Sequence, residues 1–268
     1  MQFQLYSDLH TELIKKKMRF ETSAEILILA GDIGSLTSNT FKPFIDEVSK
    51  KWKHVVYVPG NHEYYIKTHS ITELQRLYME FFSQYNNVHY LDNDTWEYGE
   101  YLFVGSTLWS KPQNISELND FYYIQENNRL FTSKSNKKKV KKLAKLQRDT
   151  FWTMHDDSVE WIKYILNDNN SKKENDRKKV IMVTHFPPIN ENVSNPKYKD
   201  CPLRDYFTND FSTLGISLDN VKLWISGHTH YSHDFVKDGV RFLSNQLGYI
   251  DEIQTESGVD VDGLFMLE

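Results

Sequence analysis

Short groups of aspartate, asparagine and histidine recur along the chain, and each follows directly on a segment of apolar residues. In chain order they are Asp8-Leu9-His10, Gly31-Asp32, Gly60-Asn61-His62-Glu63, His185 and Gly227-His228-Thr229-His230. Carboxylate oxygen, amide oxygen and imidazole nitrogen suit hard or borderline divalent cations such as Mn, Fe, Zn, Co or Mg. A single carboxylate can also bridge two such ions. These groups predict a site for two cations, provided that the fold brings them together.

This prediction depends on all five groups occurring in this order, each at the end of an apolar segment, rather than on any single group. Asp-x-His and Gly-Asp arise often by chance, and a lone histidine such as His185 is more often structural than a ligand. The run from Gly60 to Glu63 is rarer. The single cysteine, Cys201, excludes both an intrachain disulfide and a zinc site built from cysteines.

The apolar segments before these groups have the pattern of buried strands, and they alternate with helical patterns in the first half of the chain. We expect the main strands at 2–7, 26–30, 54–58, 179–183 and 221–225. We expect helices at 41–52, 70–85 and 140–167, shorter strands at 88–91, 95–98 and 101–105, and a small antiparallel edge at 234–237, 240–244 and 262–267. In such an α/β sheet, binding sites form at the carboxyl ends of the strands, which would bring the polar groups together.

The net charge and the lengths of the apolar segments limit the partners and the location that we expect for this protein. The 268 residues carry a formal net charge of −5, which gives no general reason to expect binding to nucleic acid or to an anionic membrane. No segment approaches the roughly 18 apolar residues of a membrane span, and the first residues lack a secretory pattern. We therefore expect a single domain over 1–268 with no membrane partner, located in the cytoplasm. The lysine-rich stretch 133–145 is interpreted as solvated surface, with contact to a polyanion as the alternative.

The ordered set resembles the motifs of the calcineurin-like metallophosphoesterase superfamily, which run D-x-H, GD, GNH[DE], a lone His and GH-x-H. The resemblance is closer still to small bacterial-type members of unknown substrate. It is carried there by Ser7 to His10, Pro59 to Tyr65, Thr107 to Trp109 and Gly227 to His230. It covers nearly the whole chain, with 133–145 and 167–179 the least familiar parts.

The resemblance implies an α/β fold of four layers, α/β/β/α, with two central mixed sheets flanked by helices. It also implies two divalent metal ions, with Mn, Fe or Zn expected first and Mg, Co or Ni as further candidates. Carried over by position, the ligands of one ion are Asp8, His10, Asp32 and His230. Those of the second ion are Asp32, Asn61, His185 and His228, so that Asp32 bridges the two ions.

The implied reaction is hydrolysis of a small phosphate ester, either a monoester or a diester, by a hydroxide that bridges the two metals. His62 would not bind metal. As an imidazolium it would act as the general acid and protonate the leaving group. It then needs an acidic neighbour to hold its charge. Glu63 is adjacent in sequence, although neighbouring residues usually point in different directions.

Two departures from the family patterns bear on specificity. Phosphoprotein phosphatases continue the second motif as GDxxDRG, whereas here Asp32 is followed by Ile-Gly-Ser-Leu, so that activity is not expected. The close relatives often carry an NPRGY-like segment, which here reads Asn-Gln-Leu-Gly-Tyr over 245–249.

Two alternatives to a phosphoesterase for small esters stay open. They are a nuclease acting on a polyanionic substrate and a non-catalytic protein-interaction module on the same fold. The complete ligand set disfavours the module. The sequence leaves the natural substrate and the oligomeric state open.

Overall fold

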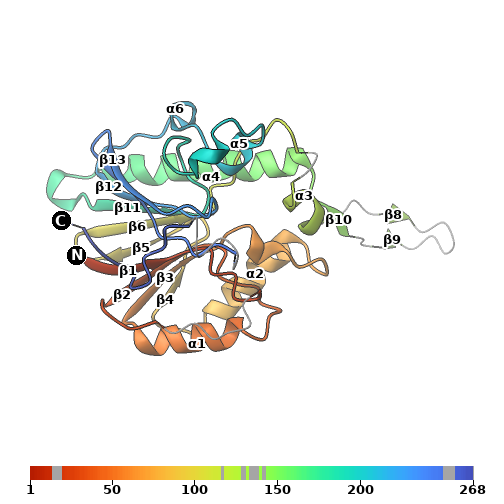
Figure 1. Cartoon of the computed structure of the whole chain (residues 1–268), viewed down its shortest axis with the longest axis horizontal. Helices are drawn as coiled ribbons and strands as arrows, with labels where there is room; N and C mark the ends of the chain where they lie inside the picture. Colours follow the sequence, from red (N-terminus) through yellow and green to blue (C-terminus); the bar gives the residue numbers. More distant parts are fainter. Residues whose placement is uncertain are drawn as a thin grey trace.

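Two large β-sheets lie face to face, with helices on the outer face of each (Figure 1). This computed structural model describes residues 1–13, 20–115, 118–127, 131–132, 139–140, 143–249 and 257–267. In Figure 1, α1 and α2 cover one sheet from below, while α4, α5 and α6 cover the other from above. The predicted four-layer α/β/β/α sandwich is thereby confirmed.

The first sheet has the strand order β15-β1-β2-β3-β4. Its parallel strands are β1 (Gln2–Tyr6), β2 (Ile26–Ala30), β3 (His54–Val58) and β4 (Val88–Tyr90), and β15 (Leu264–Met266) pairs antiparallel with β1. The helices α1 (Phe41–Lys51) and α2 (Ile71–Phe82) connect its strands, and a 3-10 turn, η1 (His62–Tyr64), follows β3. Ser70 caps α2 through a reciprocal pair of hydrogen bonds with Glu73, which fixes where this helix begins.

The second sheet has the order β13-β14-β12-β11-β6-β5. Its strands are β5 (Asp94–Tyr98), β6 (Tyr101–Ser106), β11 (Lys179–Thr184), β12 (Val221–Ile225), β13 (His233–Lys237) and β14 (Val240–Ser244). The four middle strands run parallel to one another, and the two edge strands are antiparallel to their neighbours. The outer helices are α4 (Arg148–Ser171), α5 (Arg204–Phe207) and α6 (Phe211–Leu214).

The remaining elements are short. They are α3 (Asp120–Tyr123), η2 (Glu174–Asp176) and η3 (Pro196–Tyr198), together with the antiparallel pairs β7 (Gln125–Asn127) with β10 (Leu143–Lys145) and β8 (Phe131–Thr132) with β9 (Lys139–Val140). The paired strands β8 and β9 lie away from the two sheets in Figure 1. None of the helices in the described part of the chain is both long and apolar enough to cross a membrane.

The strands are apolar on both faces because both faces are covered. On β2, Ile26 and Ile28 face the layer between the two sheets, whereas Leu27 and Leu29 pack under the helices α1 and α2. The inter-sheet layer continues across the second sheet through residues such as Phe103. This double burial explains the continuous apolar runs, and it anchors the strand ends from which the polar groups project.

Two sequence predictions about elements are wrong in detail. The helix predicted over 140–167 begins at Arg148, because the backbone at Gln147 is extended and 143–145 pairs with β7 as a strand. The predicted antiparallel edge is divided between the sheets. β13 and β14 pair as expected, but β14 also joins β12 in parallel and β15 extends the first sheet. Most of the lysine-rich stretch 133–145 lies outside the described residues.

The layer between the sheets should carry much of the stability. Phe103 is fully buried there, so we expect Phe103→Ala to lower the free energy of unfolding by about 3–5 kcal/mol, from lost burial and the cavity left behind. Urea denaturation measures this change. The matched control is Tyr164→Ala, whose ring is 69% exposed and which should change stability by less than about 0.5 kcal/mol. Similar losses for both variants would contradict this account of the core.

Candidate metal centre

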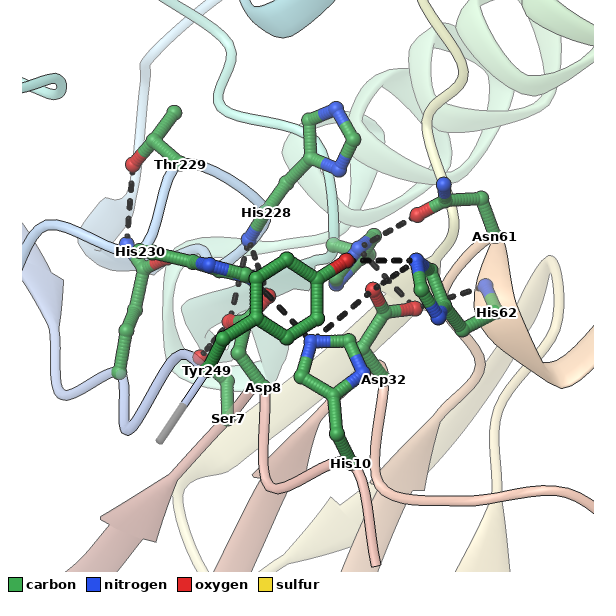
Figure 2. A network of polar contacts seen from close by, with 12 residues as sticks. Ser7, Asp8, His10, Asp32, Asn61, His62, His228, Thr229, His230 and Tyr249 are labelled. Carbon is green, nitrogen blue, oxygen red and sulfur yellow. Dashed lines mark hydrogen bonds and ion pairs between the residues drawn. The ribbon is translucent and has the colours of Figure 1, made fainter. Parts of the chain in front are cut away.

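The polar groups singled out in the sequence meet where strands of both sheets end. Asp8, Asp32 and Asn61 follow β1, β2 and β3 of the first sheet, whereas His185 and His228 follow β11 and β12 of the second. Figure 2 shows the side chains of Asp8, Asp32, Asn61 and His228 reaching a common region from separate loops, with Tyr249 in front of them. The carboxyl ends of the two sheets therefore form one site between them.

Within this site, carboxylates and imidazoles form groups whose ligand atoms lie within 4.8 Å of one another. The groups are Asp8 with His10 and His230, His10 with Asp32 and His62, and Asp32 with His185 and His228. The side-chain oxygen of Asn61 lies 3.0 Å from His185 Nε2. The structure thus brings together all eight residues that the sequence singled out, and Asp32 belongs to two of the groups.

The residues present fit bound cations, because Nε2 of His228 is buried within this site without a hydrogen-bond partner among the described residues. His10 turns its Nε2 toward His230 Nε2 at 3.1 Å and Asp32 Oδ2 at 3.9 Å. Leaving a buried polar atom unpaired is costly, and coordination to a cation would remove that cost. Burial, together with the nearby His185 charge, holds the pKa of His228 well below its ordinary value. A neutral imidazole is the form that binds metal.

The buried carboxylates make the site favour positive charge. Burial lowers the pKa of His185, but Asp32 and Asp8 outweigh it and raise that pKa to about 9. Burial raises the pKa of Asp32, but the neighbouring histidines hold it well below its ordinary value. The raised pKa of His185 and the lowered pKa of Asp32 have the same cause. Ionised aspartates lie close to imidazoles in a buried region that excludes solvent.

The backbone around the site is strained at the residues that form these groups. Asp8, His10, Asp32, His228 and His230 all have positive φ, between 43° and 71°. Non-glycine residues adopt this conformation rarely, and such strain clusters at functional sites. The aspartates help to hold it, because Asp8 accepts the His228 N–H at 3.1 Å and Asp32 accepts the His62 N–H at 2.9 Å.

Glu63 joins the loops after β2 and β3. Its buried carboxylate accepts the backbone N–H groups of Asp32 at 3.1 Å and Gly60 at 2.8 Å. It also accepts the Tyr57 hydroxyl at 2.7 Å. Burial and the charge of Asp32 raise the pKa of Glu63 to about 7. Since these bonds turn the carboxylate toward the backbone, Glu63 is not the acidic neighbour of His62.

Glu12, which the sequence analysis missed, faces His62 instead. Glu12 Oε1 lies 3.8 Å from His62 Nδ1 and 3.6 Å from His10 Nδ1, and Asp32 Oδ2 lies 3.9 Å from His62 Nε2. Burial lowers the pKa of His62, but Asp32 and Glu12 outweigh this effect, so that its net shift is upward. Only the proximity of Glu12 to Asp8 and His10 in the sequence could have pointed to it.

Two further residues were not assigned a role from the sequence. The Tyr249 hydroxyl lies 3.3 Å from His62 Nε2. Tyr249 is the last residue of the segment 245–249, which was compared with the NPRGY pattern, so the sequence did draw attention to this segment. Asp120 lies in a stretch for which the sequence predicted no helix or strand, and no motif marked it. Its buried carboxylate accepts a hydrogen bond from Asn61 Nδ2 at 2.9 Å.

A cavity of about 360 Å³ opens beside the carboxylate and imidazole groups. Its lining includes Asp32, His62 and His228, the charged Arg204, and apolar side chains such as Phe207. The ring centroid of Phe207 lies 5.4 Å from that of His228. The cavity can hold a small organic group next to the polar centre.

Comparisons with known proteins show what the sequence and the fold are similar to. The family model for calcineurin-like phosphoesterases matches residues 1–232. An uncharacterized protein of Acanthamoeba polyphaga mimivirus is 31% identical over 254 residues, which cover 90% of this chain and 85% of the viral protein. The crystal structure of phosphopantetheinyl hydrolase from Mycobacterium tuberculosis superposes with a TM-score of 0.64 at 17% identity, covering 94% of this chain and 90% of that chain.

The chain belongs to the calcineurin-like phosphoesterase family. This family depends on a pair of metal ions, and the aspartate and histidine groups described above could bind metals. Membership therefore supports metal-dependent hydrolysis of phosphate esters in general. The resemblance inferred from the sequence motifs is confirmed.

Substitution of Gly60 tests whether the close contact between the loops that carry Gly60 and Asp32 is needed for stability and metal binding. A Cβ atom at this position would lie 2.2 Å from Asp32 Oδ1 and 2.6 Å from the Asp32 backbone nitrogen. We therefore expect Gly60→Ala to displace Asp32 and to lower the free energy of unfolding by about 3 kcal/mol. Urea denaturation and metal analysis of the purified protein measure both effects.

Gly99→Ala is the control for this prediction. Gly99 has φ +59° with nothing within 4 Å of an added Cβ, so its substitution introduces backbone strain of about 1 kcal/mol without a clash. A Gly60→Ala variant as stable as Gly99→Ala, with unchanged metal content, would show that the close approach to Asp32 has no consequence.

Proposed function

We propose that this protein hydrolyses small phosphate esters with a pair of divalent metal ions. The first ion would be held by Asp8, His10, Asp32 and His230. The second would be held by Asp32, Asn61, His185 and His228. Asp32 is proposed as the shared ligand because its carboxylate belongs to two of the observed groups.

The observation that carries this proposal is the convergence of buried carboxylates with imidazoles, one of which, His228, has a buried Nε2 without a hydrogen-bond partner in the described part of the chain. A structural cluster of histidines would be expected to satisfy its nitrogens with carbonyl or hydroxyl groups. Here His228 Nε2 is buried next to Asp32 and His185 without such a partner. Metal identity is left open by this donor set, for which manganese, iron and zinc are the first candidates.

Two bound ions would supply positive charge that makes water acidic enough to ionise near neutral pH and that neutralises the phosphoryl oxygens. The chain itself would supply rigid positioning. The strained loops, the carboxylate of Glu63 and the buried Asp8 and Asp32 hold the ligand atoms before substrate arrives, which lowers the reorganisation needed during reaction.

His62 is proposed as the general acid. It lines the cavity, its imidazole is flanked by Glu12 and Asp32, and its ring stacks on Tyr65 with a centroid separation of 4.2 Å. The two carboxylates favour the imidazolium form, and the stacking fixes the plane of the ring. A proton on His62 could therefore pass to the leaving oxygen of a phosphate ester seated in the cavity.

The two-metal proposal predicts the behaviour of metal-free protein. After chelation we expect no hydrolysis of bis(4-nitrophenyl) phosphate or 4-nitrophenyl phosphate, and recovery when Mn, Fe, Zn, Ni or Mg is added back separately. His228→Ala should remove an orphaned nitrogen and weaken one metal site. The matched control is His155→Ala, which removes a buried histidine bonded to the Trp109 carbonyl.

Elemental analysis and the rate of nitrophenolate release measure the outcome. Full activity in metal-free protein, or equal metal content in His228→Ala and wild type, would contradict the two-metal assignment. The ratio of diester to monoester hydrolysis decides which ester class is preferred, which the geometry leaves open.

The role of His62 predicts a dependence on the leaving group. His62→Ala should retain bound metal, because His62 is not proposed as a ligand. It should slow hydrolysis of phenyl phosphate by about 10²-fold or more, since phenolate is a poor leaving group that needs a proton. The loss for 4-nitrophenyl phosphate should be much smaller. Equal losses for the two esters, measured as kcat, would exclude His62 as the proton donor.

A further inference from the structure

The side-chain amide of Asn61 is held from both ends. Its oxygen lies 3.0 Å from His185 Nε2, on the side of the carboxylate and imidazole groups. Its nitrogen donates a hydrogen bond to Asp120 Oδ1 at 2.9 Å, on the opposite side. Asn61 and Asp120 are buried, with exposed fractions of 2% and 0%.

Asp120 is itself fixed by residues from other elements. The Tyr65 hydroxyl donates to Asp120 Oδ1 at 2.7 Å, and the Tyr206 hydroxyl donates to Asp120 Oδ2 at 2.9 Å. Tyr65 follows η1, Tyr206 belongs to α5, and Asp120 begins α3. Both tyrosines also line the cavity beside the metal centre. Through these hydrogen bonds the Asp120 carboxylate connects α3 to α5 and to the residue after η1, on the side of Asn61 away from the proposed second metal site.

The chemistry of an amide makes this contact directional. Only the amide oxygen can bind a cation, and the NH₂ group can only donate hydrogen bonds. An ionised carboxylate can only accept hydrogen bonds, so Asp120 pairs favourably with the nitrogen of Asn61 and repels its oxygen. Rotating the amide by half a turn would place two oxygens in contact and would turn the NH₂ group toward His185.

We propose that Asp120 is a positioning residue that orients the amide oxygen of Asn61 toward the second metal ion. The inference rests on the proposed function, because it assumes that Asn61 is a ligand. Asp120 acts through Asn61 and does not touch the ion or the substrate. A partner that orients a ligand in this way typically changes metal affinity by about 10–100-fold when it is removed.

The test compares Asp120→Ala with Asp120→Asn in the full chain. Asp120→Ala removes the carboxylate acceptor of Asn61 Nδ2 and leaves the Tyr65 hydroxyl, at 3.2 Å, as a neutral acceptor. In Asp120→Asn the new amide oxygen can still accept from Asn61 and Tyr65, while the Tyr206 hydroxyl turns to accept from the new NH₂ group. Asp92→Ala is the matched control, because Asp92 also accepts hydrogen bonds from a tyrosine, Tyr64, and from Gln75, but has no contact with Asn61.

The probe is Mn²⁺ alone, titrated calorimetrically and followed by electron paramagnetic resonance, which distinguishes coupled ion pairs from single ions. We expect Asp120→Ala to bind the second Mn²⁺ about 10–100-fold more weakly and to lose the coupled signal. Asp120→Asn should retain most of the affinity, and Asp92→Ala should match wild type. A purely structural role would make Asp120→Ala and Asp92→Ala behave alike, which would overturn the proposal.

A crystal structure of metal-free Asp120→Ala separates this proposal from the proposed function. We expect the Asn61 amide to leave its present orientation. An amide oxygen that still faces His185 would overturn the positioning role. If wild type bound none of Mn²⁺, Fe²⁺ and Zn²⁺, the proposed function would fail and this inference with it, whereas an Asp120→Ala variant that bound two Mn²⁺ ions as tightly as wild type would overturn the positioning role alone. Should Asp120→Ala not fold, Asp120→Ser removes the same acceptor and leaves a smaller void.

Discussion

The structure is organised around two ionised aspartates, Asp8 and Asp32, that are buried where the two sheets meet. Isolated charges in such a position are very costly unless positive charge lies beside them. The protein surrounds them with imidazoles, and the lowered pKa of Asp32 and the raised pKa of His185 are both in the direction that favours positive charge in the site. The surrounding loops, the strained backbone and the hydrogen-bonded carboxylates serve to keep this arrangement in place.

Three buried or half-buried carboxylates hold different parts of the site in place. Glu63 links the loops after β2 and β3 through backbone N–H groups, so the loops that carry Asp32 and Asn61 cannot move independently. Asp120 joins the Asn61 amide to α3 and α5 behind the site. Glu12 faces His62 at the other end. The carboxylates of Glu63, Asp120 and Glu12 thus contact the residues that are proposed to bind metal or to react.

Much of the fold and the composition of the site could be predicted from the sequence. The doubly buried strands are visible as apolar runs, and residues such as Asp8, Asp32 and His228 stand directly at their ends. The start of α4 was missed because Leu143 and Leu146 continue a helical spacing, although the chain before Arg148 pairs as a strand. Asp120 was missed because its role depends on tertiary contacts with Asn61 and Tyr206, which leave no local pattern.

The most direct measurement is anomalous X-ray diffraction from crystals of the wild-type protein grown with Mn²⁺. We expect a pair of anomalous peaks about 3.5–4 Å apart, the separation usual in two-metal sites, with the Asp32 carboxylate between them and His228 Nε2 next to one of them. A map with no peak among these side chains, or with manganese bound only elsewhere on the surface, would contradict the account.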